Sequence, residues 1–295
     1  MQDQRTLPQI IVDRLLGIKG DVLNVPVPGT SLSSSEERLD VLLKRHTVRI
    51  KVEAIDAVTG QVNYTYLKTS GAYQDYRQLT ALLPAFDLAT LASREQKLAF
   101  WLNLYNALVI DGIIHYGIRK TVNEVPGFFR RVAYNVGGYR FSLDDIEHGI
   151  LRANAGHLII PGPQFGKNDS RCSFVLDQVD FRIHFALVCG AASCPPVSFY
   201  DPQQIDVQLD LAARNFMEQT IEVEPHRQIV KLSKLMQWYG EDFGAGIWMK
   251  LGFGNRQQLF NALKPYISDD IMREIPESRK MRVYFKTYNW SLNAV

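Results

Sequence analysis

The most apolar stretch of the chain runs from Leu98 to Tyr116, LAFWLNLYNALVIDGIIHY, and predicts one long helix. A capping-box sequence, Ser93-Arg-Glu-Gln96, precedes it, and Gly117 follows it as a C-terminal stop. Apolar residues occur nearly all round this helix. We therefore expect it to lie buried in the middle of the protein.

The length of this stretch is close to the roughly 20 residues that a membrane-spanning helix needs. It nevertheless contains four polar side chains that are costly in hydrocarbon unless partnered, Asn103, Asn106, Asp111 and His115. A helix in the core of a soluble protein is the better interpretation, and no other segment of the sequence resembles a span. We expect no membrane span.

Alternation of apolar and polar residues predicts short strands elsewhere. Thr47 to Leu67 predicts a hairpin that turns at Thr59-Gly60, and Phe181 to Cys189 predicts a strand that ends at Gly190. Ile229 to Leu232 predicts another strand, and the segment from Met281 to Leu292 a strand or an extended tail.

Apolar residues at helical spacing, bounded by capping residues, glycine or proline, predict further helices. The predicted segments are Ile10–Leu16, Glu36–Arg45, Tyr73–Leu83, Ser142–Arg152, Ile205–Glu218 and Ser233–Phe243. In the fourth of these, Ser142 is the expected N-cap, and Asp144 and Asp145 complement the helix dipole.

Helices and strands are interspersed without regular alternation, which favours the α+β class. We expect a long buried central helix packed on a small, mostly antiparallel sheet. Residues 1–45 are predicted to form a helical lead-in and a Pro/Ser-rich linker, VPVPGTSLSSSEE, and residues 46–295 a single domain.

The charge balance gives no general attraction to nucleic acid or to an anionic membrane, because 33 basic residues face 31 acidic ones. Partners are therefore expected among small molecules, peptides or proteins, and we expect no cofactor. Three cysteines are too few for a disulfide framework, and the N-terminus shows no secretory signal. Both observations predict a cytoplasmic protein with free thiols.

The strongest candidate for chemistry is Arg182 to Pro196, RIHFALVCGAASCPP. A cysteine near His184 ionises more easily, because an imidazolium stabilises a thiolate. In a flat strand His184 and Cys189 lie on opposite faces, whereas Cys194 follows a turn and can return to either face. Cys194 is therefore the better nucleophile candidate, and Cys189 replaces it if the strand contains a bulge.

Three other interpretations of this segment stay open. Cys189 can be a small core residue and Cys194 a buried loop anchor. The two cysteines can form a disulfide or a redox pair, although their spacing is not Cys-x-x-Cys. With His184 they can also supply three ligands to an open metal site, although Cys-x4-Cys lacks the second ligand pair of a structural zinc site.

Two further groups of residues could serve the same site. Glu147 and His148 point about 100° apart on a helix, so only one of them can face a small site directly. Either could orient His184. Alternatively, they belong to an ordinary ion pair on the helix surface, or Glu147 is a carboxylate that satisfies a partner in the core. Asn103 and Asn106 lie one turn apart on the long helix, where they either bond loop backbone or act as an oxyanion donor or imidazole orienter.

Four stretches together resemble the domain of unknown function 547 family. They are FWLNLYNAL (Phe100–Leu108), SLDDIEHGILR (Ser142–Arg152), RIHFALVCGAASCPP (Arg182–Pro196) and YNWSLN (Tyr288–Asn293). They occur in the family's order over roughly residues 60–295.

The resemblance implies little about activity, which is not generally established for this family. It implies a domain that occurs alone in bacteria and beside glutaredoxin-like or DEP modules in larger eukaryotic proteins. The chain departs from the family pattern at Val188, where Asn is common, and at Asn289, where Asp is usual. By loose analogy, papain-like and transglutaminase-like enzymes also pack a long central helix against a sheet that carries a histidine.

Two main function classes follow from these observations, beside a third, a metal-dependent enzyme. The first is a thiol-dependent hydrolase or acyl/amide transferase with Cys194 or Cys189 as nucleophile and His184 as base. In this class Glu147, His148, Asn103 or Asn106 would orient the base. The second is a non-catalytic binding module whose motifs preserve the fold.

Overall fold

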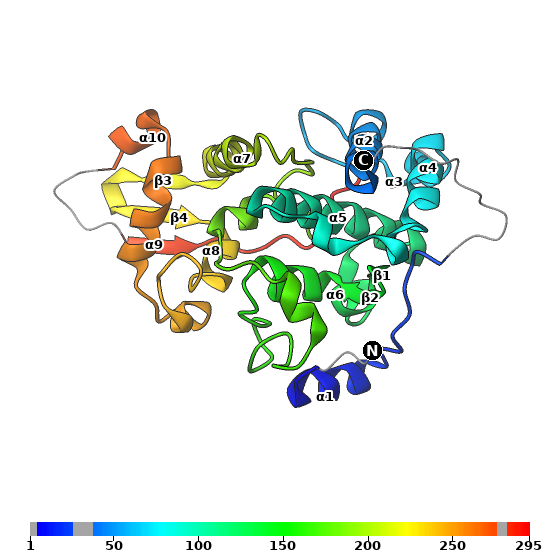
Figure 1. Ribbon diagram of the computed structural model, residues 1–295. Helices are drawn as coiled ribbons and strands as arrows, with labels where there is room; N and C mark the ends of the chain where they lie inside the picture. The colour runs from blue at the N-terminus through cyan, green and yellow to red at the C-terminus, as the bar shows by residue number, and fades with distance from the viewer. Residues whose placement is uncertain (1–4, 26–37, 276–281) are drawn as a thin grey trace. The chain divides into compact units, whose positions relative to one another are not determined.

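The computed structural model describes residues 5–25, 38–275 and 282–295. The Pro/Ser-rich linker predicted from the sequence lies almost entirely outside the described residues. The chain groups into two compact units (Figure 1). The first comprises Met1–Val179, Leu187–Ile205 and Trp290–Val295, and the second comprises Asp180–Ala186 and Asp206–Asn289.

The first unit is mainly helical. Its α-helices are α1 (Leu7–Leu16), α2 (Leu39–Ala54), α3 (Tyr64–Leu67), α4 (Gly71–Thr80), α5 (Arg94–Tyr116) and α6 (Phe128–Arg131). Short 3-10 turns η1 (Leu83–Ala85), η2 (Leu88–Thr90), η3 (Val122–Glu124) and η5 (Ser170–Phe174) connect them, and η4 (Asp145–Leu151) is a π-helix. Strands β1 (Ala133–Val136) and β2 (Tyr139–Ser142) pair antiparallel, with Ala133 opposite Ser142.

Helix α5 is the long buried helix that the sequence predicts. The Ser93 side chain accepts a hydrogen bond from the Gln96 backbone, the Gln96 side chain completes the capping box, and Gly117 ends the helix in the left-handed conformation. The helix is apolar over most of its length because it lies in the core, where every residue from Leu98 to Ile114 is buried. One side of it packs on the β1–β2 hairpin, where the Tyr134 hydroxyl donates to Asp111 over 2.7 Å.

By length and composition alone, α5 could also cross a membrane. Within its most apolar window, 94% of the residues are buried inside the protein. A core helix passes the same length and hydropathy test, so this match is weak support for a span.

One predicted hairpin and one predicted strand are wrong. The proposed hairpin over Thr47–Leu67 is largely helical, because α2 continues to Ala54 and α3 begins at Tyr64. The buried positions of α2, Leu43, Thr47, Ile50 and Ala54, recur every three or four residues, and only a bridge between Ile55 and Val62 remains of the hairpin. The proposed strand over Phe181–Cys189 begins instead as a 3-10 helix.

The second unit combines a three-stranded sheet with short helices. The sheet has the order β3 (Glu222–Glu224), β4 (Ile229–Leu232), β5 (Arg282–Phe285), with β4 antiparallel to β3 and parallel to β5. The helices are η6 (Phe181–Phe185), α7 (Ile205–Thr220), η7 (Pro225–Arg227), α8 (Lys234–Trp238), η8 (Ile247–Leu251), α9 (Arg256–Leu263), η9 (Lys264–Tyr266) and α10 (Asp269–Arg273). The predictions for α7 and β4 are confirmed, and α8 is shorter than predicted.

The core of this unit forms where α7, β4 and the segments after α8 bring apolar side chains together. Phe216, Val230, Met249 and Leu259 are among its fully or almost fully buried members. Long and short helices with two small sheets confirm the α+β class.

We expect Gly149→Ala to destabilise the first unit. A Cβ atom at Gly149, within η4, would lie 2.3 Å from the ring of Phe165, which is itself buried. Overpacking of this kind costs about 1–3 kcal/mol, so the urea midpoint of unfolding should fall. Gly71→Ala is the matched control, because its Cβ would meet only Arg49 at an ordinary 3.5 Å. Equal midpoints for the two variants would contradict the prediction.

Candidate active site

Asn103 and Asn106 on α5 hold the loop that follows the cysteines. The Asn103 amide donates to the Tyr200 carbonyl over 2.8 Å and accepts the Tyr200 N–H over 2.6 Å. The Asn106 amide donates to the Ser198 carbonyl over 3.0 Å and accepts the Val188 N–H over 3.1 Å. Unpaired, such buried groups would each cost about 1–3 kcal/mol. These contacts favour an anchoring role for both amides, and an oxyanion or orienting role stays a prediction.

Cys189 and Cys194 are joined by a disulfide, with their Cα atoms 6.1 Å apart. The expectation of free thiols is therefore wrong for these two residues and holds for Cys172. The bond forms because Gly190 adopts the left-handed region at φ 76° and returns the chain toward Cys189. An odd number of cysteines does not exclude one such local pair.

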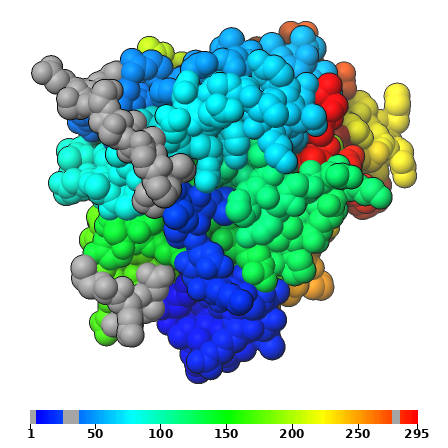
Figure 2. Space-filling view, turned by 90° about the vertical axis from the view of Figure 1, so that its right-hand side faces the viewer, coloured from blue at the N-terminus to red at the C-terminus, as the bar shows by residue number. Residues whose placement is uncertain are grey.

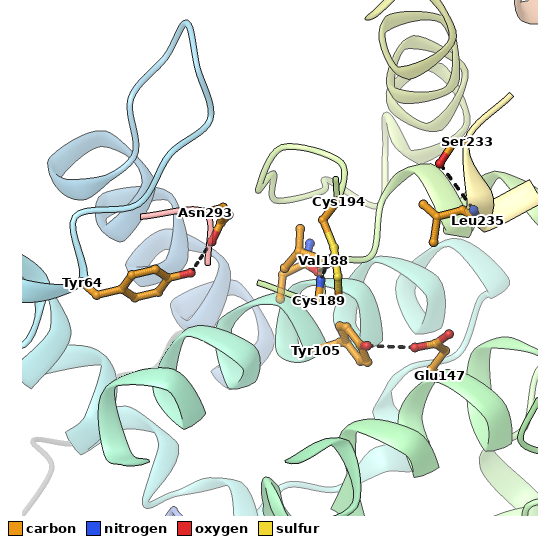
Figure 3. Close-up of a disulfide and its surroundings, with 10 residues drawn as sticks. Tyr64, Tyr105, Glu147, Val188, Cys189, Cys194, Ser233, Leu235 and Asn293 are labelled. Atoms are coloured by element: carbon orange, nitrogen blue, oxygen red, sulfur yellow. Dashed lines mark hydrogen bonds between the residues drawn. A yellow bond between two sulfur atoms is a disulfide. The ribbon is translucent and has the colours of Figure 1, made fainter. Parts of the chain in front are cut away.

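Gly190 also fits the loop closely against α5. A Cβ atom there would lie 2.7 Å from the Ile113 side chain. The next residue, Ala191, bridges to Leu292 of the C-terminal segment, and the Asn293 N–H donates to the Gly190 carbonyl over 3.0 Å. The segment Trp290–Val295, which belongs to the first unit, thus lies beside the disulfide loop, as Figure 3 shows for Asn293.

A hydrogen-bonded pair from α5 and η4 lies among the surroundings of the disulfide (Figure 3). The Tyr105 hydroxyl donates to the Glu147 carboxylate over 2.8 Å. Glu147 is 8% exposed and His148 only 3%, so neither belongs to an ordinary surface ion pair. Glu147 thus lies among the surroundings of the disulfide, as Figure 3 shows.

His148 belongs to a second cluster, together with Asp144 and His157. The His148 Nε2 atom lies 4.0 Å from one Asp144 carboxylate oxygen, and the His157 Nε2 atom lies 3.9 Å from the other. The two rings meet edge to face with centroids 5.0 Å apart. His157 was not predicted from the sequence, because it lies beyond the π-helix and no periodic pattern relates it to His148.

The donor set of this cluster, two imidazoles and one carboxylate within 4.8 Å of one another, resembles a metal site. The hydrogen bonds of the two imidazoles, however, differ from those of a metal site. The Nδ1 atom of His148 faces the Arg152 guanidinium at 3.1 Å, and that of His157 accepts the Ile159 N–H at 3.1 Å. Because both partners can only donate, each Nδ1 is an acceptor and each Nε2 carries the proton. The cluster therefore directs two N–H groups at a carboxylate, and neither imidazole presents an unprotonated Nε2 atom to a metal.

Asp144 and Asp145 are neighbours in opposite electrostatic environments. Burial raises the pKa of Asp144 to about 6, against the effect of the Arg130 guanidinium 3.4 Å away. Burial acts on Asp145 in the same direction, but Arg5, Arg171 and Arg140 together hold the pKa of its carboxyl well below its usual range. Asp145 is therefore a permanent anion, and Asp144 exchanges its proton near pH 6.

His184 lies in η6 of the second unit. Its Nε2 atom is 2.7 Å from an Asp242 carboxylate oxygen, and its ring stacks on Tyr239 with centroids 3.9 Å apart. The carboxylate partner is thus Asp242, which follows α8 and was not singled out in the sequence. A carboxylate on one imidazole nitrogen fixes the orientation of the ring, as in catalytic His–Asp pairs.

The two cysteines belong to the first unit and His184 to the second. Their pairing as nucleophile and base therefore stays a prediction. The alternation of side chains along a strand does not apply to His184, because residues 181–185 form a 3-10 helix rather than a strand.

A small cleft also opens on α5, beside Asn103. It is lined by Asp40, Leu43, Lys44, Thr47, Tyr76, Phe100, Asn103 and Leu104. No cysteine or histidine lines it, so we do not identify it with the reactive groups described above.

A family model described as "Protein of unknown function, DUF547" matches residues 89–217. These residues match the DUF547 family, and the resemblance is confirmed for the three motifs that lie within them, from Phe100 to Leu108, from Ser142 to Arg152 and from Arg182 to Pro196. The comparisons with curated proteins and with solved structures found no match. The analogy with papain-like and transglutaminase-like folds is accordingly not confirmed.

Asp144 should make the protein less stable as the pH rises from about 4 to 6. Its pKa is higher in the folded state, about 6, than the roughly 3.9 of an unfolded chain. The folded state therefore binds more protons in this window, and the free energy of unfolding falls by up to about 3 kcal/mol. We expect Asp144→Asn, whose amide stays neutral, to flatten this slope in urea unfolding. Identical slopes in the variant and the parent protein would refute the assignment.

Proposed function

We propose that the protein is a thiol-dependent hydrolase or acyl/amide transferase with Cys194 as its nucleophile. The observation that supports this choice is the hydrogen bond from the Cys189 backbone N–H to the Cys194 sulfur, 2.9 Å long. A backbone donor stabilises the negative charge of a thiolate and lowers its pKa. Cys194 is half-buried, so solvent reaches this part of the loop.

The disulfide is the oxidised, resting form in this proposal. A small dithiol or a protein dithiol reduces it: the S–S bond breaks, two thiols form, and the dithiol becomes a disulfide. The Cys194 thiolate then attacks an acyl carbonyl, and a C–S bond forms as the C–N or C–O bond breaks. The leaving amine or alcohol takes up a proton. Water or an acceptor amine finally attacks the thioester and releases Cys194.

The sequence predicts His184 as the base for such a nucleophile. Within the second unit its Nε2 atom is hydrogen-bonded to Asp242, and a carboxylate in this position orients an imidazole for proton transfer.

The alternative is a non-catalytic binding module. The hydrogen bonds of Asn103 and Asn106 to backbone groups favour it, because they make these two amides part of the scaffold. In this case the disulfide is a staple that fixes the loop after Val188. The two functions differ in the reactivity of Cys194 after reduction.

Alkylation rates test the proposal directly. We expect iodoacetamide at pH 7, after mild reduction, to label Cys194 at least about tenfold faster than Cys172. Cys172 is an internal control, because burial raises the pKa of its thiol. Rates are read by mass spectrometry of peptides, with circular dichroism to show that the fold is kept. Equal rates at the two cysteines would exclude an activated thiolate.

Serine variants separate the nucleophile from its partner. In Cys189→Ser the disulfide cannot form, so an acyl-transfer probe should label Cys194 without added reductant. Cys194→Ser should abolish labelling, and Cys172→Ser should leave it unchanged. If the disulfide is only a staple, Cys189→Ser and Cys194→Ser should lower the unfolding midpoint by similar amounts, and the probe should label neither.

A further inference from the structure

A loop of the second unit exposes four large apolar side chains within seven residues. This loop, Gly246–Gly254, is called the η8 loop below. Ile247 is 51% exposed, Trp248 63%, Leu251 59% and Phe253 82%. Apolar exposure this concentrated marks a binding surface more often than a chance distribution of single residues.

The shape of the loop explains which residues face outward. A 3-10 helix has three residues per turn, so η8 presents three faces. Met249 occupies one face and is fully buried in the core of the second unit. The other two faces carry Trp248 with Leu251, and Ile247 with Lys250. Phe253 follows directly after the turn at Gly252, whose φ is 90°.

Backbone contacts hold the loop in this form. The Phe253 N–H donates to the Trp248 carbonyl over 3.1 Å, and the Asn255 N–H donates to the Ala245 carbonyl over 2.8 Å. Gly254 permits this closure, because a Cβ atom there would lie 2.6 Å from Met249 and 2.7 Å from the Ala245 carbonyl oxygen. The outward apolar residues thus belong to a closed loop anchored by Met249.

The stretch of sequence that contains the loop carries charges of one sign. Between Asp242 and Asp269 the sequence contains no acidic residue, and its only charged side chains are Lys250, Arg256 and Lys264. All three are exposed. An apolar tip beside exposed basic groups is complementary to an anionic lipid surface, where acyl chains lie beneath phosphates.

We propose that the η8 loop binds peripherally to an anionic membrane. Trp248, Leu251, Ile247 and Phe253 enter the boundary between headgroups and acyl chains, where aromatic rings are favoured. Lys250, Arg256 and Lys264 stay at the level of the lipid phosphates. The loop supplies contact with the surface and no span, so the rest of the second unit stays outside the bilayer.

Vesicle binding by the full chain tests this proposal. Vesicles of phosphatidylcholine with phosphatidylserine should bind the protein, and vesicles of phosphatidylcholine alone should bind it more weakly. The double variant Trp248→Ser/Phe253→Ser should reduce the partition coefficient at least about tenfold. Lys250→Gln should weaken binding only to the anionic vesicles, and added salt should remove this difference. The matched control is Val58→Ser, which removes a side chain that is 92% exposed outside the loop.

Fluorescence gives an independent readout. Of the four tryptophans, Trp248 is strongly exposed and Trp101 is fully buried. Anionic vesicles should shift the emission of the parent protein to the blue, and Trp248→Phe should remove most of this shift. Urea unfolding shows whether each variant keeps the parent fold.

Three results would overturn the proposal. They are absence of binding to any vesicle, equal loss of binding in Val58→Ser, and unchanged binding in Trp248→Ser/Phe253→Ser. Self-association that depends on Phe253, without vesicle binding, would assign the loop to a second copy of the chain and also overturn it. The alkylation rate of Cys194 does not enter these outcomes, so the test is independent of the proposed function.

Discussion

The first unit depends on the pairing of the polar groups that α5 carries into the core. A helix buried on all sides cannot leave an amide or carboxylate without a partner, because each would cost more than a typical contact contributes. Asp111 is satisfied by Tyr73, Arg77 and Tyr134, which fixes α4 and β1 against one side of the helix. Asn103 and Asn106 are satisfied by the loop around the disulfide. The disulfide loop is therefore positioned by the same constraint that stabilises the fold.

Local signals in the sequence predicted what local physics determines. The capping box at Ser93 and the stop at Gly117 define α5 correctly, since both act within one helical turn. The pattern of apolar residues gave the wrong prediction at α2, because Val48, Ile50 and Val52 also fit the period of two that is typical of a strand. Of these three side chains, Val48 and Val52 are exposed and Ile50 is buried. Tertiary packing, which buries Thr47 and Ile50 on one face, decided between the two periods.

The candidate site shows the same difference between what local sequence predicts and what distant contacts determine. His184 and the cysteines were visible as residue types, and the π-helix contributed Glu147 and His148 as expected candidates. The partner of His184 was not predictable, because Asp242 lies 58 positions further along the chain. Asp144 and Asp145 are chemically identical in the sequence, and only the three arginines gathered around Asp145 give them opposite pKa shifts. Charge networks assembled from distant segments leave no periodic trace.

The disulfide connects the chemistry of the loop to the compartment in which the protein works. A cytoplasmic location was predicted from free thiols, and that premise holds only for Cys172. A reducing environment opens disulfides, and under the proposed function the Cys194 sulfur, which accepts the Cys189 N–H, is then the nucleophile. In an oxidising environment the same two atoms form a permanent staple. The two proposed functions thus differ by one covalent bond, and the redox potential around the molecule determines whether that bond is present.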